Sequence, residues 1–267
     1  MPESSAPARA RPRLYHAPSS YYSMIARLAL AEGGIAYMPV FTDIHARLAQ
    51  QRPDYVRLNP NMTVPTLVLP ARVLTQSRDI AAYALGVEQG LGEEDRAWLD
   101  LHYALPIEEL TFGRLLARSR LARFMVPKVL AKARRGLLRH AVQNPDLAPL
   151  YEARAALFTA RIRTFDPAAV VQLAAQRQSQ ALAILTKMEQ TLADGRATLV
   201  AAGYGIADVV LTVFLARIAF TGLGAEITCR PALLRYWQAM QARPSFAQAD
   251  IWTRFHPLRA LRAIAGL

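Results

Sequence analysis

Residues 59–85 read NPNMTVPTLVLPARVLTQSRDIAAYAL, and they contain the clearest structural pattern in the chain. Two short apolar runs, residues 66–69 and 72–74, are separated by Pro70-Ala71, a pattern that predicts a β-hairpin. Residues 77–85 then carry apolar side chains at helical spacing, which predicts a helix directly after the hairpin. This strand, strand, helix order forms the C-terminal part of a larger predicted unit, whose N-terminal part precedes residue 59.

That upstream part opens with a short apolar run at residues 13–16, which predicts a strand. A helical pattern follows over residues 24–29 and stops at Gly33-Gly34. Residues 35–41 predict a second strand, which is parallel to the first if the intervening helix is a right-handed crossover. With a polar helical or loop segment between the two halves, the order βαβ, α, ββα predicts a four-stranded mixed sheet.

Strand patterns disappear beyond the linker at residues 86–92, and helical spacing of apolar residues dominates the remainder of the chain. The most apolar stretch, residues 206–225, is long enough to suggest a transmembrane helix, but it contains Asp208 and Arg217. We therefore expect a buried helix there. The predicted organisation is a flexible tail at 1–12, an α+β domain at 13–86, and an all-helical domain with long central helices at 93–267.

Composition limits the classes of function. The 267 residues are 53% apolar, and 32 Lys and Arg against 20 Asp and Glu give a net charge of +12, which favours anionic ligands or surfaces. Because no nucleic-acid motif accompanies this charge, no nucleic-acid partner is expected. The single cysteine, Cys229, cannot form an intramolecular disulfide or a thiolate metal site, and the five His residues lack paired ligand spacing. We expect no metal and a reducing, cytoplasmic location.

Three features occur in an order that resembles the glutathione transferase superfamily over nearly the whole chain. They are a first helix opened by Ser, Val64-Pro65 before the hairpin, and Gln76-Ser77 at the start of the next helix. The resemblance implies that family's fold, in which a thioredoxin-like domain that binds glutathione precedes an all-α domain. It also implies a homodimer.

Within that superfamily, two branches are similar to this chain. PDYVRLN at residues 53–59, VPTLV at 64–68 and IAD at 206–208 resemble the tetrachlorohydroquinone reductive dehalogenase group. The long central helices and QNPDL at 143–147 also resemble the ganglioside-induced differentiation-associated proteins, a branch associated with mitochondrial membranes. Two different functions therefore share one fold.

The family's chemistry uses the thiolate of glutathione, and the N-terminus of the first helix favours that anion. Alignment on the SYYS run at residues 20–23 puts Ser20 where Ser-type members keep their catalytic hydroxyl. Tyr22, Tyr15 and Ser19 are nearby substitutes. Ser20 is alternatively only the N-cap of the helix, and both roles can coexist.

The other contacts to glutathione are implied by the same resemblance. It implies a cis peptide bond before Pro65, with Val64 offering its backbone N–H and C=O to the cysteinyl portion. Gln76 and Ser77 suit the γ-glutamyl carboxylate, unless they merely cap the helix that they open. Arg78 is a further candidate at the γ-glutamyl end, unless it points to solvent, and the candidates for the glycyl carboxylate are Asn61 and Arg47.

Reductive dehalogenation is understood to need a protein thiol, and the cysteine position of that group aligns here with Tyr22. A hydroxyl cannot form the mixed disulfide, so we reject that activity. What remains is Ser-supported chemistry in which glutathione conjugates, isomerises or cleaves the ether of a hydrophobic aromatic substrate. The acceptor pocket is expected between the domains, although aromatic residues at helical spacing can equally form plain core. Its candidate lining is Tyr21, Tyr22, Tyr103, Phe112 and Phe214.

A basic segment offers a competing function. Residues 114–139 contain nine Lys or Arg and no Asp or Glu, interleaved with apolar residues such as Phe124 and Met125. The C-terminal FHPLRALRAIAGL, residues 255–267, repeats the theme. A solvated helix face is one interpretation. The other is a membrane-associated or adaptor protein that keeps the fold, has little catalysis, and contacts anionic lipids through these helices.

Overall fold

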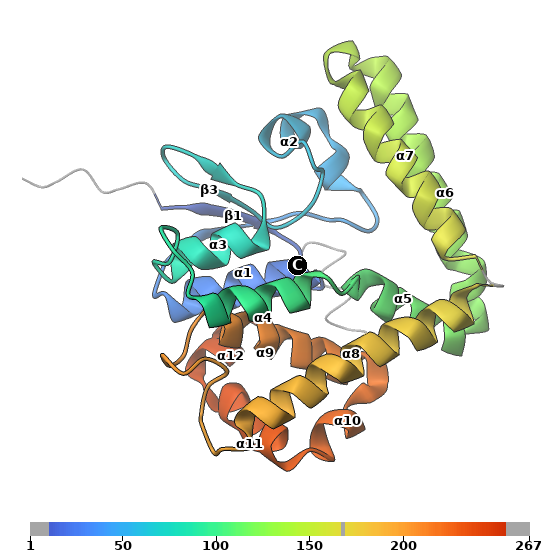
Figure 1. Cartoon of the computed structure of the whole chain (residues 1–267). Helices are drawn as coiled ribbons and strands as arrows, with labels where there is room; N and C mark the ends of the chain where they lie inside the picture. Colours follow the sequence, from blue (N-terminus) through green and yellow to red (C-terminus); the bar gives the residue numbers. More distant parts are fainter. Residues whose placement is uncertain (1–10, 167–168, 255–267) are drawn as a thin grey trace, which may run out of the picture.

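The computed structural model describes residues 11–166 and 169–254 and contains a four-stranded mixed sheet (Figure 1). The strands lie in the order β2-β1-β3-β4, with β1 and β2 parallel and the other neighbours antiparallel. Leu14 faces Leu67 across the β1–β3 pair, and both are fully buried. The predicted sheet is therefore confirmed. Its strands are β1 (Arg13–His16), β2 (Met38–Phe41), β3 (Thr66–Val68) and β4 (Val73–Leu74).

The second strand begins three residues later than the pattern at 35–41 predicts. Gly34 has a φ of +63° and turns the chain at the end of α1, and the N–H of Ile35 donates to Leu30 O at 2.9 Å. Since this amide closes the helix, the chain joins the sheet only at Met38. The helices of this part are α1 (Tyr21–Glu32), the short η1 (Ala49–Gln51), α2 (Pro53–Leu58) and α3 (Ser77–Ala84).

From residue 93 onward, the elements that the structure describes are helices (Figure 1). Helices α1 and α3 lie between the sheet and this helical part, and one apolar cluster runs through all three layers. The helices are α4 (Glu93–Tyr103), α5 (Ile107–Arg118), α6 (Arg120–Gln143), η2 (Pro145–Leu147), α7 (Ala148–Thr164), α8 (Val170–Leu192), α9 (Ile206–Ile218), η3 (Ala219–Leu223), α10 (Ala225–Thr228), α11 (Pro231–Ala242) and α12 (Pro244–Gln248).

Helix α9 forms the centre of the helical part. Every residue of α9 is buried, and 83% of the apolar window Ile206–Leu223 lies inside the structure, as expected of a core helix. Asp208 holds the start of α9 because its carboxylate accepts from the N–H groups of Gly205 at 3.0 Å and Leu199 at 2.9 Å. The apolar run at 206–225 is therefore explained by burial in the protein.

Helices α6 and α7 form a hairpin that projects beside α2 (Figure 1). The hairpin packs around its own apolar cluster, in which Leu137 and Tyr151 are fully buried. Val56 of α2 belongs to the same cluster, and the hydroxyl of Tyr151 donates to Gln51 O at 2.9 Å. The hairpin is thus attached to the sheet-containing part, and α7 lies near the loop that precedes β3. The predicted tail at 1–12, except its last two residues, and the basic C-terminal segment 255–267 lie outside the described residues.

Candidate active site

The N-terminus of α1 is built around Ser20. The N–H of Ser20 donates to Ala17 O at 3.1 Å, which closes the turn before the helix. Its Oγ accepts from the N–H of Ser23 at 3.3 Å, so Ser20 is the N-cap of α1. The cap uses a lone pair of the hydroxyl, and the hydroxyl hydrogen can still be donated to a ligand. Because the first turn of α1 has no acidic residue, its positive end remains suited to an anion.

The neighbouring hydroxyls are placed differently. Ser19 Oγ lies 2.9 Å from Nε2 of His45. The ring of Tyr15 packs edge-on against Tyr55, with 5.7 Å between the ring centres. Tyr22 lines a cavity between α1 and α7. Of the substitutes for Ser20, Tyr22 is therefore the one whose side chain reaches an open space.

Two residues expected in the acceptor pocket belong to the core instead. Tyr21 is 6% exposed, and its hydroxyl lies 2.5 Å from Nε2 of His102. Phe214 is fully buried in α9 and lies edge-on to the same imidazole. Neither residue lines the cavity. This corrects the expectation for both: Tyr21 lies on the buried face of α1, and Phe214 belongs to α9, which is buried on all sides.

Arg217 of α9 lies behind the N-terminus of α1, a placement that sequence reasoning missed. Its guanidinium stacks over the rings of Tyr21 and Phe220 and donates to Ser19 O at 3.5 Å. Its Nε has no hydrogen-bond partner among the described residues. Burial lowers the pKa of Arg217 to about 10, so the side chain stays charged at neutral pH. The position of Arg217 inside the apolar run 206–225 was the one sequence feature that could have indicated a buried charge.

The segment that carries Val64 is held rigidly. The peptide bond between Val64 and Pro65 is cis, as the resemblance implies. The hydroxyl of Tyr55 donates to Thr63 O at 2.5 Å, and the amide of Asn59 donates to the same oxygen at 2.9 Å. Val64 packs in a small apolar cluster with Tyr55 and Ala17, which places it beside the turn before Ser20. The supporting residues Tyr55 and Asn59 come from the PDYVRLN motif, but the motif alone does not show what they hold.

The start of α3 carries the residues expected to bind the γ-glutamyl end. Gln76 is the N-cap residue of α3, is exposed, and makes no capping bond with its side chain. Ser77 Oγ lies 3.0 Å from the hydroxyl of Tyr103 in α4. Arg78 instead forms an ion pair with Asp100 at 3.0 Å on the outer surface. The two candidates for the glycyl carboxylate, Asn61 and Arg47, are both exposed on loops.

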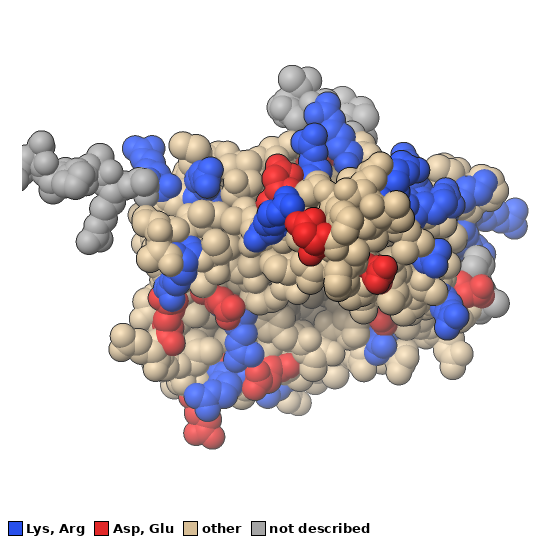
Figure 2. Space-filling view, turned by 90° about the horizontal axis from the view of Figure 1, so that it is seen from above, with Lys and Arg blue, Asp and Glu red and all other residues tan. Residues whose placement is uncertain are grey.

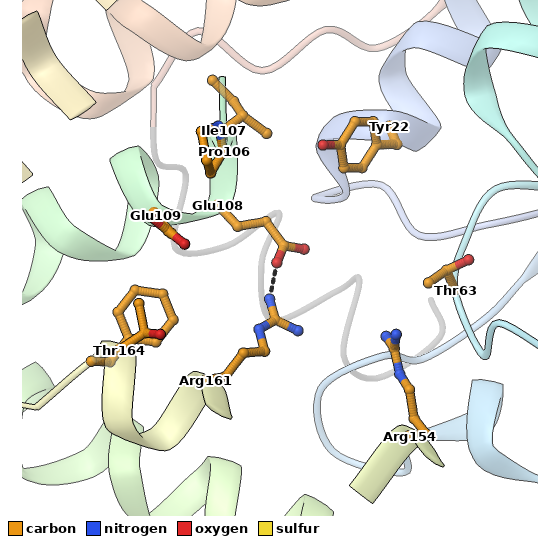
Figure 3. Close-up of a pocket in the computed structure, with 10 residues that line it drawn as sticks. Tyr22, Thr63, Pro106, Ile107, Glu108, Glu109, Arg154, Arg161 and Thr164 are labelled. Atoms are coloured by element: carbon orange, nitrogen blue, oxygen red, sulfur yellow. Dashed lines mark hydrogen bonds and ion pairs between the residues drawn. The ribbon is translucent and has the colours of Figure 1, made fainter. Parts of the chain in front are cut away.

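A cavity of about 330 Å³ opens next to Tyr22 (Figure 3). Its walls come from α1, the loop before β3, the start of α5, and α7. Tyr103, predicted to line an acceptor pocket, instead stacks against Tyr22 at 6.4 Å, and Phe112 packs against the lining residue Phe165 at 5.8 Å. The lining residues are Tyr22, Thr63, Pro106, Ile107, Glu108, Glu109, Arg154, Arg161, Thr164 and Phe165.

The charges in this cavity are largely organised as pairs. Glu108 pairs with Arg161, the contact drawn as a dashed line in Figure 3, and Glu109 pairs with Arg177 at 2.7 Å. Burial raises the pKa of Tyr22, although the Arg161 and Arg217 charges oppose the shift. The phenol of Tyr22 is therefore protonated at neutral pH and can donate a hydrogen bond. Within residues 11–166 and 169–254, no cluster of three or more His, Cys, Asp or Glu side chains could hold a metal ion.

Comparison with known proteins agrees with this architecture. Residues 14–89 match the family described as glutathione S-transferase, N-terminal domain. The chain is 32% identical over 249 residues to the tetrachloro-p-hydroquinone reductive dehalogenase of Sphingobium chlorophenolicum, with 89% of this chain and 95% of that protein covered. It is 27% identical to the glutathione S-transferase TCHQD of Arabidopsis thaliana, with 88% and 87% covered.

A solved structure with the same fold is the beta-etherase LigF from a Sphingobium species. The two structures have a TM-score of 0.63 and 20% sequence identity, with 89% of this chain and 98% of that chain covered. At 20% identity, the likeness to LigF shows a shared fold. The 32% identity to the Sphingobium dehalogenase extends over nearly the whole chain and shows membership of a common family. The chain belongs to the glutathione S-transferase superfamily and lies near the tetrachlorohydroquinone dehalogenase group.

Proposed function

We propose that this protein is a glutathione transferase in which Ser20 donates a hydrogen bond to the thiolate of glutathione. The thiolate then attacks or isomerises a hydrophobic aromatic acceptor, by conjugation or ether cleavage. The observation that carries the proposal is the geometry of Ser20, whose Oγ accepts from the α1 backbone at 3.3 Å and keeps its hydrogen for a ligand. A thiol has an ordinary pKa above neutrality, so the hydroxyl and the helix N-terminus together would favour the anion.

In this proposal the remainder of glutathione lies along the adjacent backbone. Its cysteinyl portion would pair with the main chain of Val64, which lies beside the turn before Ser20. Its γ-glutamyl carboxylate would meet Ser77 and the uncommitted amide of Gln76 at the N-terminus of α3. The buried charge of Arg217, behind α1, adds positive potential on the side where the sulfur would lie.

We do not propose reductive dehalogenation, the activity named for the Sphingobium relative. Tyr22 stands at the position that aligns with the cysteine of that group, and a hydroxyl cannot carry out disulfide exchange. Cys229 follows α10, is exposed, and does not line the cavity. The proposal includes a cytoplasmic homodimer, by analogy with the family.

The test replaces Ser20 with Ala and measures two quantities. One is the pKa of the thiol in the glutathione complex, followed by the ultraviolet absorbance of the thiolate. The other is turnover of an activated aryl halide and of an aromatic ether. We expect Ser20→Ala to raise the thiol pKa and to slow turnover by about tenfold or more. Ser19→Ala, which removes a hydroxyl already bonded to His45, is the matched control.

If Ser20→Ala changes neither quantity, the assignment of Ser20 is wrong. Tyr22→Phe, tested beside it, then shows whether the phenol that faces the cavity has that role. If no variant and no wild-type protein shows a thiolate signal with glutathione, the proposed function as a whole is contradicted.

A second candidate function rests on one exposed face of α6. Leu121, Phe124, Met125, Lys128 and Val129 recur at helical spacing, and we call them the α6 face. Leu121 is 70% exposed and Phe124 is 60% exposed, and Lys128 Nζ lies 3.4 Å from the centre of the Phe124 ring. Figure 2 shows Lys and Arg gathered on the side of the molecule where Figure 1 draws α6 and α7. Apolar side chains among basic ones suit the surface of an anionic membrane.

Sedimentation with phosphatidylserine vesicles tests this second candidate. We expect low-salt binding that high salt weakens and that the double variant Leu121→Gln with Phe124→Gln abolishes. Val142→Gln is the control, since Val142 is also apolar, is exposed at the other end of α6, and lies outside the α6 face. Absence of binding at low salt, or equal loss in both variants, would contradict a membrane role.

A further inference from the structure

Four charged side chains line the cavity, and three of them already have a partner of opposite charge. Glu108 pairs with Arg161, and Glu109 pairs with Arg177, which lies behind the lining. Arg154 is different, because no carboxylate of the described residues lies within ion-pair distance of it. Among the side chains that the structure describes, the cavity therefore holds one positive charge without an ion-pair partner.

The position of Arg154 is set by one face of α7. Arg154, Phe158, Arg161 and Phe165 follow one another at spacings of four, three and four residues, so they share that face. Both guanidiniums lie 5.7 Å from the ring centre of Phe158, which is 8% exposed. The guanidinium of Arg154 thus lies over one edge of the cavity beside an aromatic ring, and Figure 3 shows it directed into the open space across from Tyr22.

The environment of Arg154 favours an anionic ligand. Burial lowers the pKa of Arg154, and no neighbouring acid opposes that effect. A partly desolvated cation without a counter-charge costs free energy, which an anion in the cavity would recover. A guanidinium presents parallel N–H groups that match the two oxygens of a carboxylate. From the facing wall, the protonated phenol of Tyr22 offers a further donor.

We propose that the acceptor substrate is an aromatic compound that carries a carboxylate, and that Arg154 binds this group. The inference rests on the proposed transferase function and specifies the class of its acceptor. In a conjugation, the glutathione sulfur forms a bond to the ring carbon that bears a halogen. The carbon–halogen bond breaks, the halide leaves with the bonding electron pair, and the thiol proton passes to solvent.

A carboxylate is also present at the glycyl end of glutathione, so the experiment must separate two sources of the same group. The probes are a chloronitrobenzoate and its methyl ester, which differ in the charge of one substituent. The variants are Arg154→Met, which keeps the apolar stem and removes the charge, and Arg163→Met as control. Arg163 is exposed on the same helix and does not line this cavity.

We expect Arg154→Met to lower kcat/KM for the benzoate by about tenfold or more, chiefly through KM, because it removes a charged hydrogen bond. Turnover of the ester should stay unchanged, and Arg163→Met should change neither. Calorimetry should show that Arg154→Met retains its affinity for glutathione. A loss of glutathione affinity with an unchanged benzoate-to-ester ratio would instead assign Arg154 to the glycyl carboxylate and overturn the inference.

Three further outcomes separate this inference from the proposed function. If the wild-type protein binds glutathione but treats benzoate and ester alike, only the carboxylate site is contradicted. If it binds glutathione but turns over neither probe, titration of the benzoate into the complex with S-methylglutathione tests the site directly, and no binding overturns it. If it does not bind glutathione at all, the proposed function fails and the inference fails with it.

Discussion

The hydroxyl of Tyr21 lies 2.5 Å from Nε2 of His102, and this contact joins the first turn of α1 to the last turn of α4. Burial lowers the pKa of His102 to about 3 and raises the pKa of Tyr21 well above its ordinary value. Both side chains are therefore neutral near pH 7, and they share one hydrogen bond whose donor is set by the tautomer of the imidazole. The helix that carries the proposed thiolate site is thus anchored to the helical part by an uncharged hydrogen bond.

The first prediction concerns acid stability. In the unfolded chain, His102 has an ordinary pKa of about 6.5, so below that pH the unfolded state binds a proton that the folded state does not. Stability is present above about pH 6.5 and is lost as the pH falls toward about 3. Between about pH 7.5 and about pH 5, His102 should account for a loss of about 2 kcal/mol in the free energy of unfolding.

The contribution of His102 is measured by urea unfolding of the wild-type protein and of His102→Gln, each at about pH 7.5 and about pH 5. The variant keeps a group that can bond to Tyr21 but cannot titrate, so its loss should be smaller by the stated amount. His16, whose pKa burial lowers to about 4, titrates in both proteins and cancels in the difference. Equal losses in the two proteins would show that His102 is not buried as a neutral imidazole.

The second prediction concerns the pair that joins α1 to the turn before α12. Arg243 donates to both carboxylate oxygens of Glu32, at 2.7 and 2.6 Å, and the side chain of Glu32 is only 8% exposed. Arg243→Met leaves the Glu32 carboxylate buried with fewer partners, so we expect the free energy of unfolding to fall by about 2 kcal/mol. This loss is smaller than that for breaking a fully buried ion pair, because the side chain of Arg243 is 37% exposed and solvent weakens the pair. Arg72→Met, which breaks an exposed pair with Glu88, should leave the unfolding free energy nearly unchanged, because solvent screens that pair. Equal effects in the two variants would contradict the importance of burial.

The third prediction separates Ser77 from its neighbour in glutathione binding. Ser77→Ala should weaken glutathione binding about tenfold, which corresponds to about 1.4 kcal/mol. Arg78→Ala should leave the affinity unchanged, because the guanidinium of Arg78 is paired with Asp100 on the surface. Calorimetric titration of both variants decides between them. If Arg78→Ala is the weaker binder, the γ-glutamyl carboxylate is bound by charge and not by the hydroxyl and the helix N-terminus.

Much of the fold could be predicted because local patterns determine it. The strand predicted at residues 13–16 is observed as Arg13–His16, and the hairpin at 66–74 is marked by a proline between two apolar runs. Where prediction failed, hydrogen bonding was decisive, as at Ile35, whose amide closes α1 and delays β2. The sequence does not distinguish helix from loop at α2, since a polar segment of six residues has little periodicity to read.

The site was less predictable, for two physical reasons. Adjacent residues on a helix point about 100° apart, and the sequence does not say which of Tyr21 and Tyr22 faces the core. The structure buries Tyr21 and turns Tyr22 to the cavity. Arg154 and Arg161 reach the cavity only because the α6–α7 hairpin packs against α2, a contact between segments about 100 residues apart in the chain. No local pattern contains that information.

Glutathione binding at the surface between Ser20, Val64 and Ser77 underlies both the proposed function and the acceptor site. Calorimetric titration of the wild-type protein with glutathione measures that binding, and a parallel titration with S-methylglutathione shows what the thiol contributes. We expect saturable binding of glutathione, with weaker binding of the methylated form because it cannot present a thiolate to Ser20. If millimolar glutathione gives no heat of binding, this surface is not a glutathione site and the proposed function is wrong.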